Sequence, residues 1–255
     1  MRQLRVAFSF FTIIPLASPA SIVEVARACF LAPVVGAAVG AIAGLAGWGA
    51  EDLFDAPVAA ALALCASLLV TGLHHADGLA DLGDALMARG GRRRRVEVLK
   101  DRTLGVGAAG ALVMTYLVSW AALLELIQAV EGPAFVLCMV SVELSTRMAL
   151  LVNAAISPSS HEGSGSAFLE AARGWRGFTG VILTLAALAA AALALGYTAT
   201  VAAAAAALLT AALLSLVGRR LFGGVGGDIL GATVELARMA ALLALAAAVI
   251  ASPPV

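Results

Sequence analysis

Residues 104–127 read LGVGAAGALVMTYLVSWAALLELI, an apolar run whose single charged residue is Glu125. A run of about 20 apolar residues is long enough to cross a bilayer as a helix. Six further runs are similar in length and composition, at about 27–49, 56–74, 133–156, 178–196, 198–218 and 231–251. The sequence therefore predicts an all-α protein, a polytopic integral membrane helical bundle of about seven transmembrane helices. Because 178–196 and 198–218 are alanine-rich and nearly continuous, a count of six stays open.

The overall composition excludes a soluble protein. Hydrophobic residues make up 62% of the 255 residues and charged residues only 13%, against about 25% in a soluble domain. The longest polar stretches, 75–103 and 157–177, are too short to form a soluble domain. We therefore expect one integral membrane domain over 1–255, in contact with the lipid bilayer, and no nucleic-acid partner. The sequence leaves the oligomeric state open, a homo-oligomer included.

The basic residues gather in alternate loops between the predicted spans. They lie near the N-terminus and after the second, fourth and sixth spans: Arg2, Arg5, Arg27, Arg89, Arg92 to Arg95, Lys100, Arg102, Arg173, Arg176, Arg219 and Arg220. The other loops are acidic or uncharged. Since cytoplasmic loops carry the excess of Lys and Arg, the N-terminus and the polar segments 75–103 and 157–177 are predicted to face the cytoplasm.

The first twenty residues imitate a signal peptide, with two arginines, an apolar run and a small-residue ending. Pro15 interrupts the apolar run, so we expect residues 1–20 to form an interfacial N-terminal helix instead. In the first span, Gly36, Gly40 and Gly44 recur every fourth residue. This spacing predicts the close approach of a neighbouring helix.

Three aspartates in the run that follows the second span have helical spacing. Asp77, Asp81 and Asp84 stand at i, i+4 and i+7 and would share one helix face. Clustered carboxylates repel one another unless a hard cation such as Mg²⁺ neutralises them. The pattern predicts a Mg²⁺ site, the alternative being a solvated acidic face. His75, two residues before Asp77, is a candidate to orient a carboxylate or to act as general base.

Basic residues that suit phosphate follow within thirty residues. Arg92 to Arg95 are four consecutive arginines, and Lys100 and Arg102 lie closer to the next span. Such side chains supply charge-assisted donors to phosphate oxygens. For the four arginines we favour a topology anchor at anionic lipid heads, and we regard Lys100 and Arg102 as the better phosphate ligands.

Two further loops and one span carry polar residues of interest. Residues 157–168 contain His161 and Glu162 among small residues, and the glycine-rich 222–231 contains Asp228. The small residues of 157–168 would let backbone N–H groups approach a phosphate or nucleotide. The 222–231 segment lacks the Gly-Lys-Ser/Thr ending of a P-loop, and a flexible linker is its alternative interpretation. Glu143 and Arg147, four residues apart within a predicted span, are either a structural pair or functional groups facing the protein interior.

Taken together, these segments resemble the cobalamin synthase family, the adenosylcobinamide-GDP ribazoletransferases. The resemblance rests on four motifs in the family's order: His75-Ala76-Asp77-Gly78-Leu79-Ala80-Asp81 with Asp84; Leu99-Lys100-Asp101-Arg102 with Gly105 and Gly107; His161-Glu162-Gly163; and Gly223-Gly224 with Gly227-Asp228-Ile229-Leu230-Gly231. It covers nearly the whole chain. One departure is Ile13, where the family often has a basic residue.

The resemblance implies a Mg²⁺-dependent transferase at the last assembly stage of coenzyme B12. Its substrates would be adenosylcobinamide-GDP and α-ribazole or α-ribazole 5′-phosphate, and GMP would be released. Asp77, Asp81 and Asp84 would hold Mg²⁺, and His75 or Asp101 would assist proton removal. The substrate-binding residues would be Lys100, Arg102, His161, Glu162 and Asp228.

Two other classes fit less well. A CDP-alcohol phosphotransferase also arrays aspartates on membrane helices, but Asp81-Leu82-Gly83-Asp84 is too compact for its pattern. A transporter would use Glu125, Glu143, Arg147 and Glu235 as an ion relay. Transporters usually show an internal repeat, and none is evident here.

Overall fold

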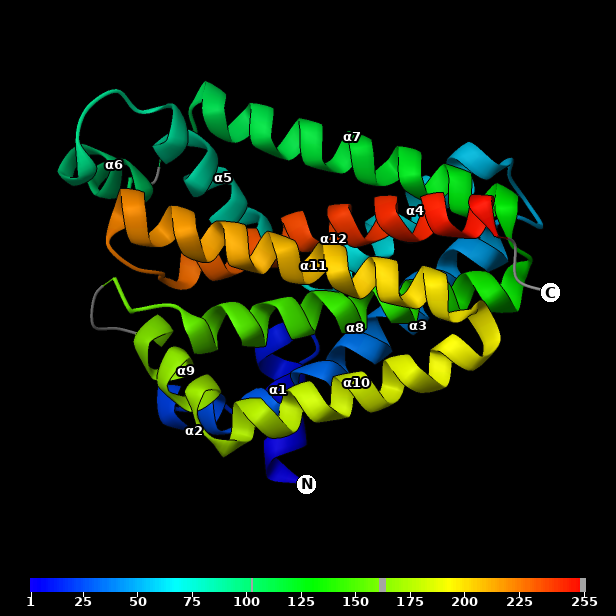
Figure 1. Ribbon diagram of the computed structural model, residues 1–255, viewed down its shortest axis with the longest axis horizontal. Helices are drawn as coiled ribbons and strands as arrows, with labels where there is room; N and C mark the ends of the chain where they lie inside the picture. The colour runs from blue at the N-terminus through cyan, green and yellow to red at the C-terminus, as the bar shows by residue number, and fades with distance from the viewer. Residues whose placement is uncertain (102, 161–163, 253–255) are drawn as a thin grey trace.

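The computed structural model describes residues 1–101, 103–160 and 164–252, and this part of the chain is a bundle of helices (Figure 1). Within the described residues, six helical segments are long and apolar enough to cross a membrane. They are Cys29–Ala50, which contains η1 (Cys29–Leu31) and α3 (Ala32–Ala50); α7 (Val106–Ala129); α8 (Gly132–Ile156); α10 (Trp175–Leu195); Tyr197–Phe222, which contains α11 (Tyr197–Val217) and the π-helix η2 (Gly218–Phe222); and α12 (Gly227–Ala251). The predicted membrane bundle is confirmed.

The predicted second span is not one straight helix. It forms α4 (Ala56–Val70) and α5 (His74–Met87), which are bent by 95° relative to each other. The joint contains Gly72 at φ 66° and Leu73 at φ 58°, both in the left-handed region. The prediction of a continuous span over 56–74 was therefore wrong at its C-terminal end, and the count is six spans plus one bent pair.

Helix α8 lies at the centre of the bundle and is its most buried span. It packs closely on α3 through the predicted glycines. A Cβ on Gly40 would lie 2.6 Å from the Met139 carbonyl oxygen, and a Cβ on Gly44 would lie 2.6 Å from the Val136 Cα. Only glycine allows the two backbones to approach this closely, which confirms the packing prediction.

The short helices gather toward the ends of the spans that carry the predicted site. Helices α5, α6 (Arg92–Leu99) and α9 (Ser164–Arg173) occupy the left end in Figure 1, with α2 (Ile22–Arg27) below them. Helix α5 lies across the first turns of α12 and α7: a Cβ on Gly78 would be 2.4 Å from the Asp228 carbonyl oxygen, and one on Gly83 would be 2.6 Å from that of Gly107. The aspartates of α5 therefore lie outside the six spanning helices.

The N-terminal segment forms the expected helix, α1 (Arg2–Phe11). Its buried face presents Val6, Ala7 and Phe11 to the core, while Arg2 is exposed and pairs with Glu24 of α2 at 2.7 Å. After α1 the chain turns back to the bent pair, because the Ile13 N–H donates to the Val70 carbonyl at 2.9 Å. This contact places α1 beside the start of α5.

Candidate functional site

Two loops that the sequence singled out separately lie side by side. Val225 N–H donates to the Pro158 carbonyl at 2.8 Å, and Ser160 N–H donates to the Val225 carbonyl at 3.2 Å. Ser159 and Val225 form an isolated parallel bridge. A Cβ on Gly224 would lie 2.5 Å from the Ser159 carbonyl carbon and the Ser160 nitrogen. The glycine-rich loop, residues 222–231, therefore packs against residues 158–160 of the serine-rich loop, residues 157–168.

A cavity of about 460 Å³, here called the central pocket, brings α5 and α12 together with α1 and α9. Three residues predicted from sequence, His75, Asp77 and Asp228, line it together. Its full lining is Ser9, Phe10, Phe11, His74, His75, Asp77, Gly78, Leu150, Gly165, Phe168, Gly227, Asp228, Leu230 and Gly231.

The aromatic side of this pocket was not predicted from the sequence. Phe10 and Phe11 come from α1 and Phe168 from α9. Phe10 and Phe11 lie a few residues before Ile13, the position at which the sequence departs from the family. Their spacing gave no hint that they meet Phe168, because that contact joins positions more than 150 residues apart.

The carboxyl group of Asp81 is perturbed by its surroundings. Its pKa is raised to about 6, first by burial and then by the negative charges of Asp77, Asp228 and Asp84. The negative charges of Asp77, Asp84 and Asp228 therefore reach the Asp81 carboxyl group.

The same carboxylates do not form a complete metal cage. Among the residues that the structure describes, no group of three His, Cys, Asp or Glu side chains is arranged to hold a metal ion. Mg²⁺ commonly takes only one or two protein carboxylates and completes its shell with water and substrate phosphate oxygens. Asp77 and Asp81 suffice as these one or two carboxylate ligands, and the Mg²⁺ site stays a prediction.

Asp84 has a structural partner that the sequence did not reveal. Its Oδ2 accepts from the Gly105 N–H at 2.7 Å and its Oδ1 from the Ala108 N–H at 2.9 Å. The carboxylate thus caps the N-terminus of α7, where backbone N–H groups lack partners within the helix. The cap fixes α5 against α7, and any metal contact of Asp84 would come in addition to it.

His75 precedes Asp77 on α5, the helix that carries the three predicted aspartates. Its pKa is lowered well below the usual value, first by burial and then by the positive charges of Arg147 and Arg238. Its Nδ1 is buried without a hydrogen-bond partner in the described part of the chain. The lowered pKa favours the neutral form of the imidazole.

Lys100 and Asp101, adjacent in sequence, line different cavities. Lys100 lies in a second cavity of about 690 Å³, here called the basic pocket, lined by Arg92, Arg93, Val96, Glu97, Leu99, Lys100, Ser160 and Phe222. Asp101 lies in a third cavity beside Asp84, and its Oδ1 accepts from the Thr103 N–H and hydroxyl at 3.1 and 2.8 Å. Asp101 and His75 are thus not in one pocket. Arg102, His161 and Glu162 lie outside the described residues.

The four consecutive arginines have different surroundings. Arg95 Nη1 donates to the Ala85 and Leu86 carbonyls at 3.0 and 2.8 Å and so caps the C-terminus of α5. Arg93 and Arg94 pair with Glu97. Arg92 lies over Gly223, where a Cβ would stand only 1.0 Å from its Nη2. The role of these arginines as a topology anchor stays a prediction.

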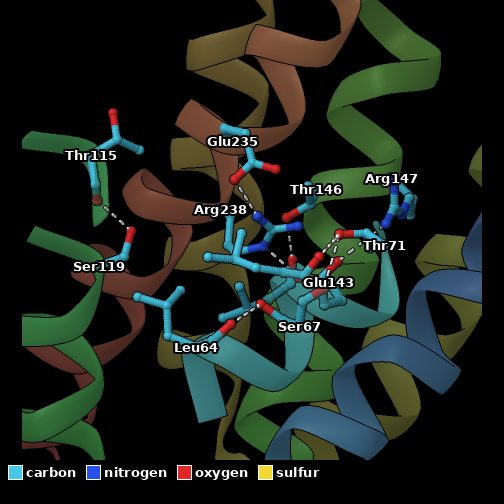
Figure 2. A network of polar contacts seen from close by, with 12 residues as sticks. Leu64, Ser67, Thr71, Thr115, Ser119, Glu143, Thr146, Arg147, Glu235 and Arg238 are labelled. Carbon is cyan, nitrogen blue, oxygen red and sulfur yellow. Dashed lines mark hydrogen bonds and ion pairs between the residues drawn. The ribbon is translucent and has the colours of Figure 1, made fainter. Parts of the chain in front are cut away.

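A network of buried charges lies in the middle of the bundle (Figure 2). Arg238 Nε donates to Glu143 Oε1 at 2.6 Å, and its Nη1 donates to Glu235. Arg147 Nη2 is 3.5 Å from Glu143 Oε2, and its guanidinium lies 5.4 Å from the centre of the Phe11 ring. The predicted Glu143–Arg147 pair is thus part of a larger structure that joins α8 to α12 and lies behind the central pocket.

Comparison with known proteins identifies the family. The family model described as cobalamin-5-phosphate synthase matches residues 3–246. A relative from Halorubrum lacusprofundi is 38% identical over 95% of this chain and 95% of its own length. One from Methanococcoides burtonii is 29% identical over 97% and 93%, and one from Shigella flexneri is 34% identical over 84% and 85%. All three are named adenosylcobinamide-GDP ribazoletransferase, and no solved structure matches the chain. The chain belongs to the cobalamin-5-phosphate synthase family.

Proposed function

We propose that this chain transfers the adenosylcobinamide phosphate group of adenosylcobinamide-GDP to α-ribazole or its 5′-phosphate, in the last assembly stage of coenzyme B12. The names of its relatives support this activity. The observation that carries it is the meeting of His75, Asp77 and Asp228 in one pocket, with Asp81 beside them.

In this reaction the ribazole 3′-hydroxyl oxygen forms a bond to the phosphorus that carries cobinamide. The bond from this phosphorus to the oxygen bridging it to the GMP phosphate breaks, and GMP leaves. The neutral imidazole of His75 takes the hydroxyl proton. We assign this role to His75 and not to Asp101, because Asp101 lines another cavity. Lys100 holds phosphate oxygens from the basic pocket, and we assign the same task to Arg102.

Asp77 and Asp81 would hold Mg²⁺, with Asp84 and Asp228 adding negative charge. When bound, the ion would neutralise charge on the diphosphate. The mutual repulsion at Asp81 supports a cation there. We assign His161 and Glu162 to substrate binding because they follow Ser160 in the chain. Ser160 donates its N–H to the Val225 carbonyl in the glycine-rich loop that also contains Asp228.

We also propose that the protein lies in the cell membrane with the N-terminus and the site at the cytoplasmic face. The gathering of basic residues in the loops at this end supports that orientation.

Purified protein mixed with adenosylcobinamide-GDP, α-ribazole and Mg²⁺ tests the proposal, with products separated by chromatography. A cobalamin and GMP should appear in equal amounts, and chelation of Mg²⁺ should stop their formation. Folded protein that forms neither product would refute the activity, whereas full turnover in excess chelator would refute the metal requirement alone.

A further inference from the structure

We infer that the central pocket is the acceptor site, which holds the flat heteroaromatic base of the nucleoside against Phe10, Phe11 and Phe168. This inference rests on the proposed function, and it assigns the acceptor nucleoside to the central pocket and the donor diphosphate to the basic pocket.

The aromatic wall of the pocket is built for a planar ring. The Phe10 and Phe11 rings lie 4.9 Å apart at 78°, and the Phe11 and Phe168 rings lie 6.3 Å apart at 80°. Phe11 and Phe168 are buried, whereas Phe10 is 45% exposed and lines the cavity. An exposed phenyl ring beside two fixed ones offers a stacking surface to any flat base, because every base has an apolar face.

The opposite side of the pocket suits the sugar. His75 and Asp77 from α5 and Asp228 from α12 line the same cavity as the phenylalanines. Carboxylate oxygens accept hydrogen bonds from ribose hydroxyls. A nucleoside with its base on the phenylalanines therefore presents its hydroxyls to His75 and Asp77, the side on which the proton must be removed.

Charge assigns the two substrates to different cavities. Among the described residues, the lining of the central pocket contains carboxylates and no lysine or arginine, so apart from the Mg²⁺ proposed at Asp77 it offers a diphosphate no positive charge. The basic pocket contributes Arg92, Arg93 and Lys100, which attract one. The volume of the central pocket, about 460 Å³, lies in the range for ligands of nucleoside size.

The test compares Phe10→Leu with the matched control Phe54→Leu in the full-length protein. Phe10 is 45% exposed and Phe54 is 49% exposed, and Phe54 lies between α3 and α4, outside the central pocket. Binding of α-ribazole to the detergent-solubilised protein is measured by titration calorimetry. Loss of one base-stacking ring should weaken binding about tenfold in Phe10→Leu. Phe54→Leu should bind like wild type, and Phe10→Trp should restore tight binding.

Steady-state kinetics give the second measurement. Phe10→Leu should raise the KM for α-ribazole and leave the KM for adenosylcobinamide-GDP within about twofold. Unchanged α-ribazole binding, or a rise confined to the KM of adenosylcobinamide-GDP, would overturn the inference even if the enzyme is active. If wild type binds α-ribazole in a ring-dependent way but forms no product, the inference stands and the proposed activity fails.

Discussion

Arg238 of α12 donates from Nε to Glu143 of α8 at 2.6 Å, and both side chains are at most 1% exposed (Figure 2). The contact joins residues 95 positions apart in the middle of the bundle. Burial of two charges is costly, and what makes it tolerable is their pairing with each other and with Glu235 and Arg147.

Removing one member of this network should destabilise the fold strongly. Arg238→Met leaves the Glu143 and Glu235 carboxylates buried with Arg147 as the remaining cation of the network, a change that costs about 3–5 kcal/mol. Thermal unfolding of the protein in detergent should show a large fall in Tm. Glu125→Gln is the control, because Glu125 is exposed on α7. A Tm of Arg238→Met equal to that of the control would contradict a stabilising network.

The sequence revealed the spans but not the bend in the second one. Hydropathy continues from Ala56 through Val70 to Leu73, and one glycine within a span is common. At the break, Ile13 packs on Gly72 and donates its N–H to the Val70 carbonyl at the end of α4. That contact comes from a distant part of the chain and leaves no local pattern.

The site was predictable where it depends on helical spacing and not where it depends on tertiary contacts. The spacing of Asp77, Asp81 and Asp84 correctly predicted a helix, since all three lie on α5. It could not show that Asp84 caps α7, because Gly105 lies 21 residues further along the chain. The phenylalanine wall was missed for the same reason.

Asp84→Ala should loosen α7 at its first turn. Loss of the cap leaves the Gly105 and Ala108 N–H groups without the carboxylate, at a cost of about 1 kcal/mol. For a protein of this size the expected fall in Tm is about 2–4 °C. Asp84→Asn, which keeps an acceptor oxygen, should recover part of that loss. Equal Tm values for Asp84→Ala and wild type would remove the capping role.

Asp81 should make the metal-free protein less stable at neutral pH. The pKa of Asp81 is about 6 in the folded state and 3.8, the ordinary value, in the unfolded state. Between pH 6 and pH 4 the folded protein therefore binds more protons at Asp81 than the unfolded protein does, and acid favours folding. Stability of wild type relative to Asp81→Asn should therefore rise as pH falls from 7 to 4, measured by Tm in chelator. Added Mg²⁺ should raise the Tm of wild type at pH 7 more than that of Asp81→Asn. A Tm difference that stays constant across this pH range would contradict the raised pKa.

Arg92 should contribute to binding of the donor substrate. Its guanidinium lies over Gly223 at the basic pocket, whereas Arg94 pairs with Glu97. Arg92→Ala should raise the KM for adenosylcobinamide-GDP about tenfold, the loss expected for one charge-assisted phosphate contact. Arg94→Ala is the matched control, and an equal effect in Arg94→Ala would assign the loss to general surface charge.

The carboxylate face of α5 is the centre of the proposed chemistry, and Asp81 lies under the influence of the other three aspartates. The most direct test is the turnover of Asp81→Asn with adenosylcobinamide-GDP, α-ribazole and saturating Mg²⁺, alongside its Tm in chelator at pH 7. Turnover should fall at least about 100-fold while the Tm stays equal to or above that of wild type, since the substitution removes charge repulsion. Wild-type turnover by folded Asp81→Asn would contradict the account.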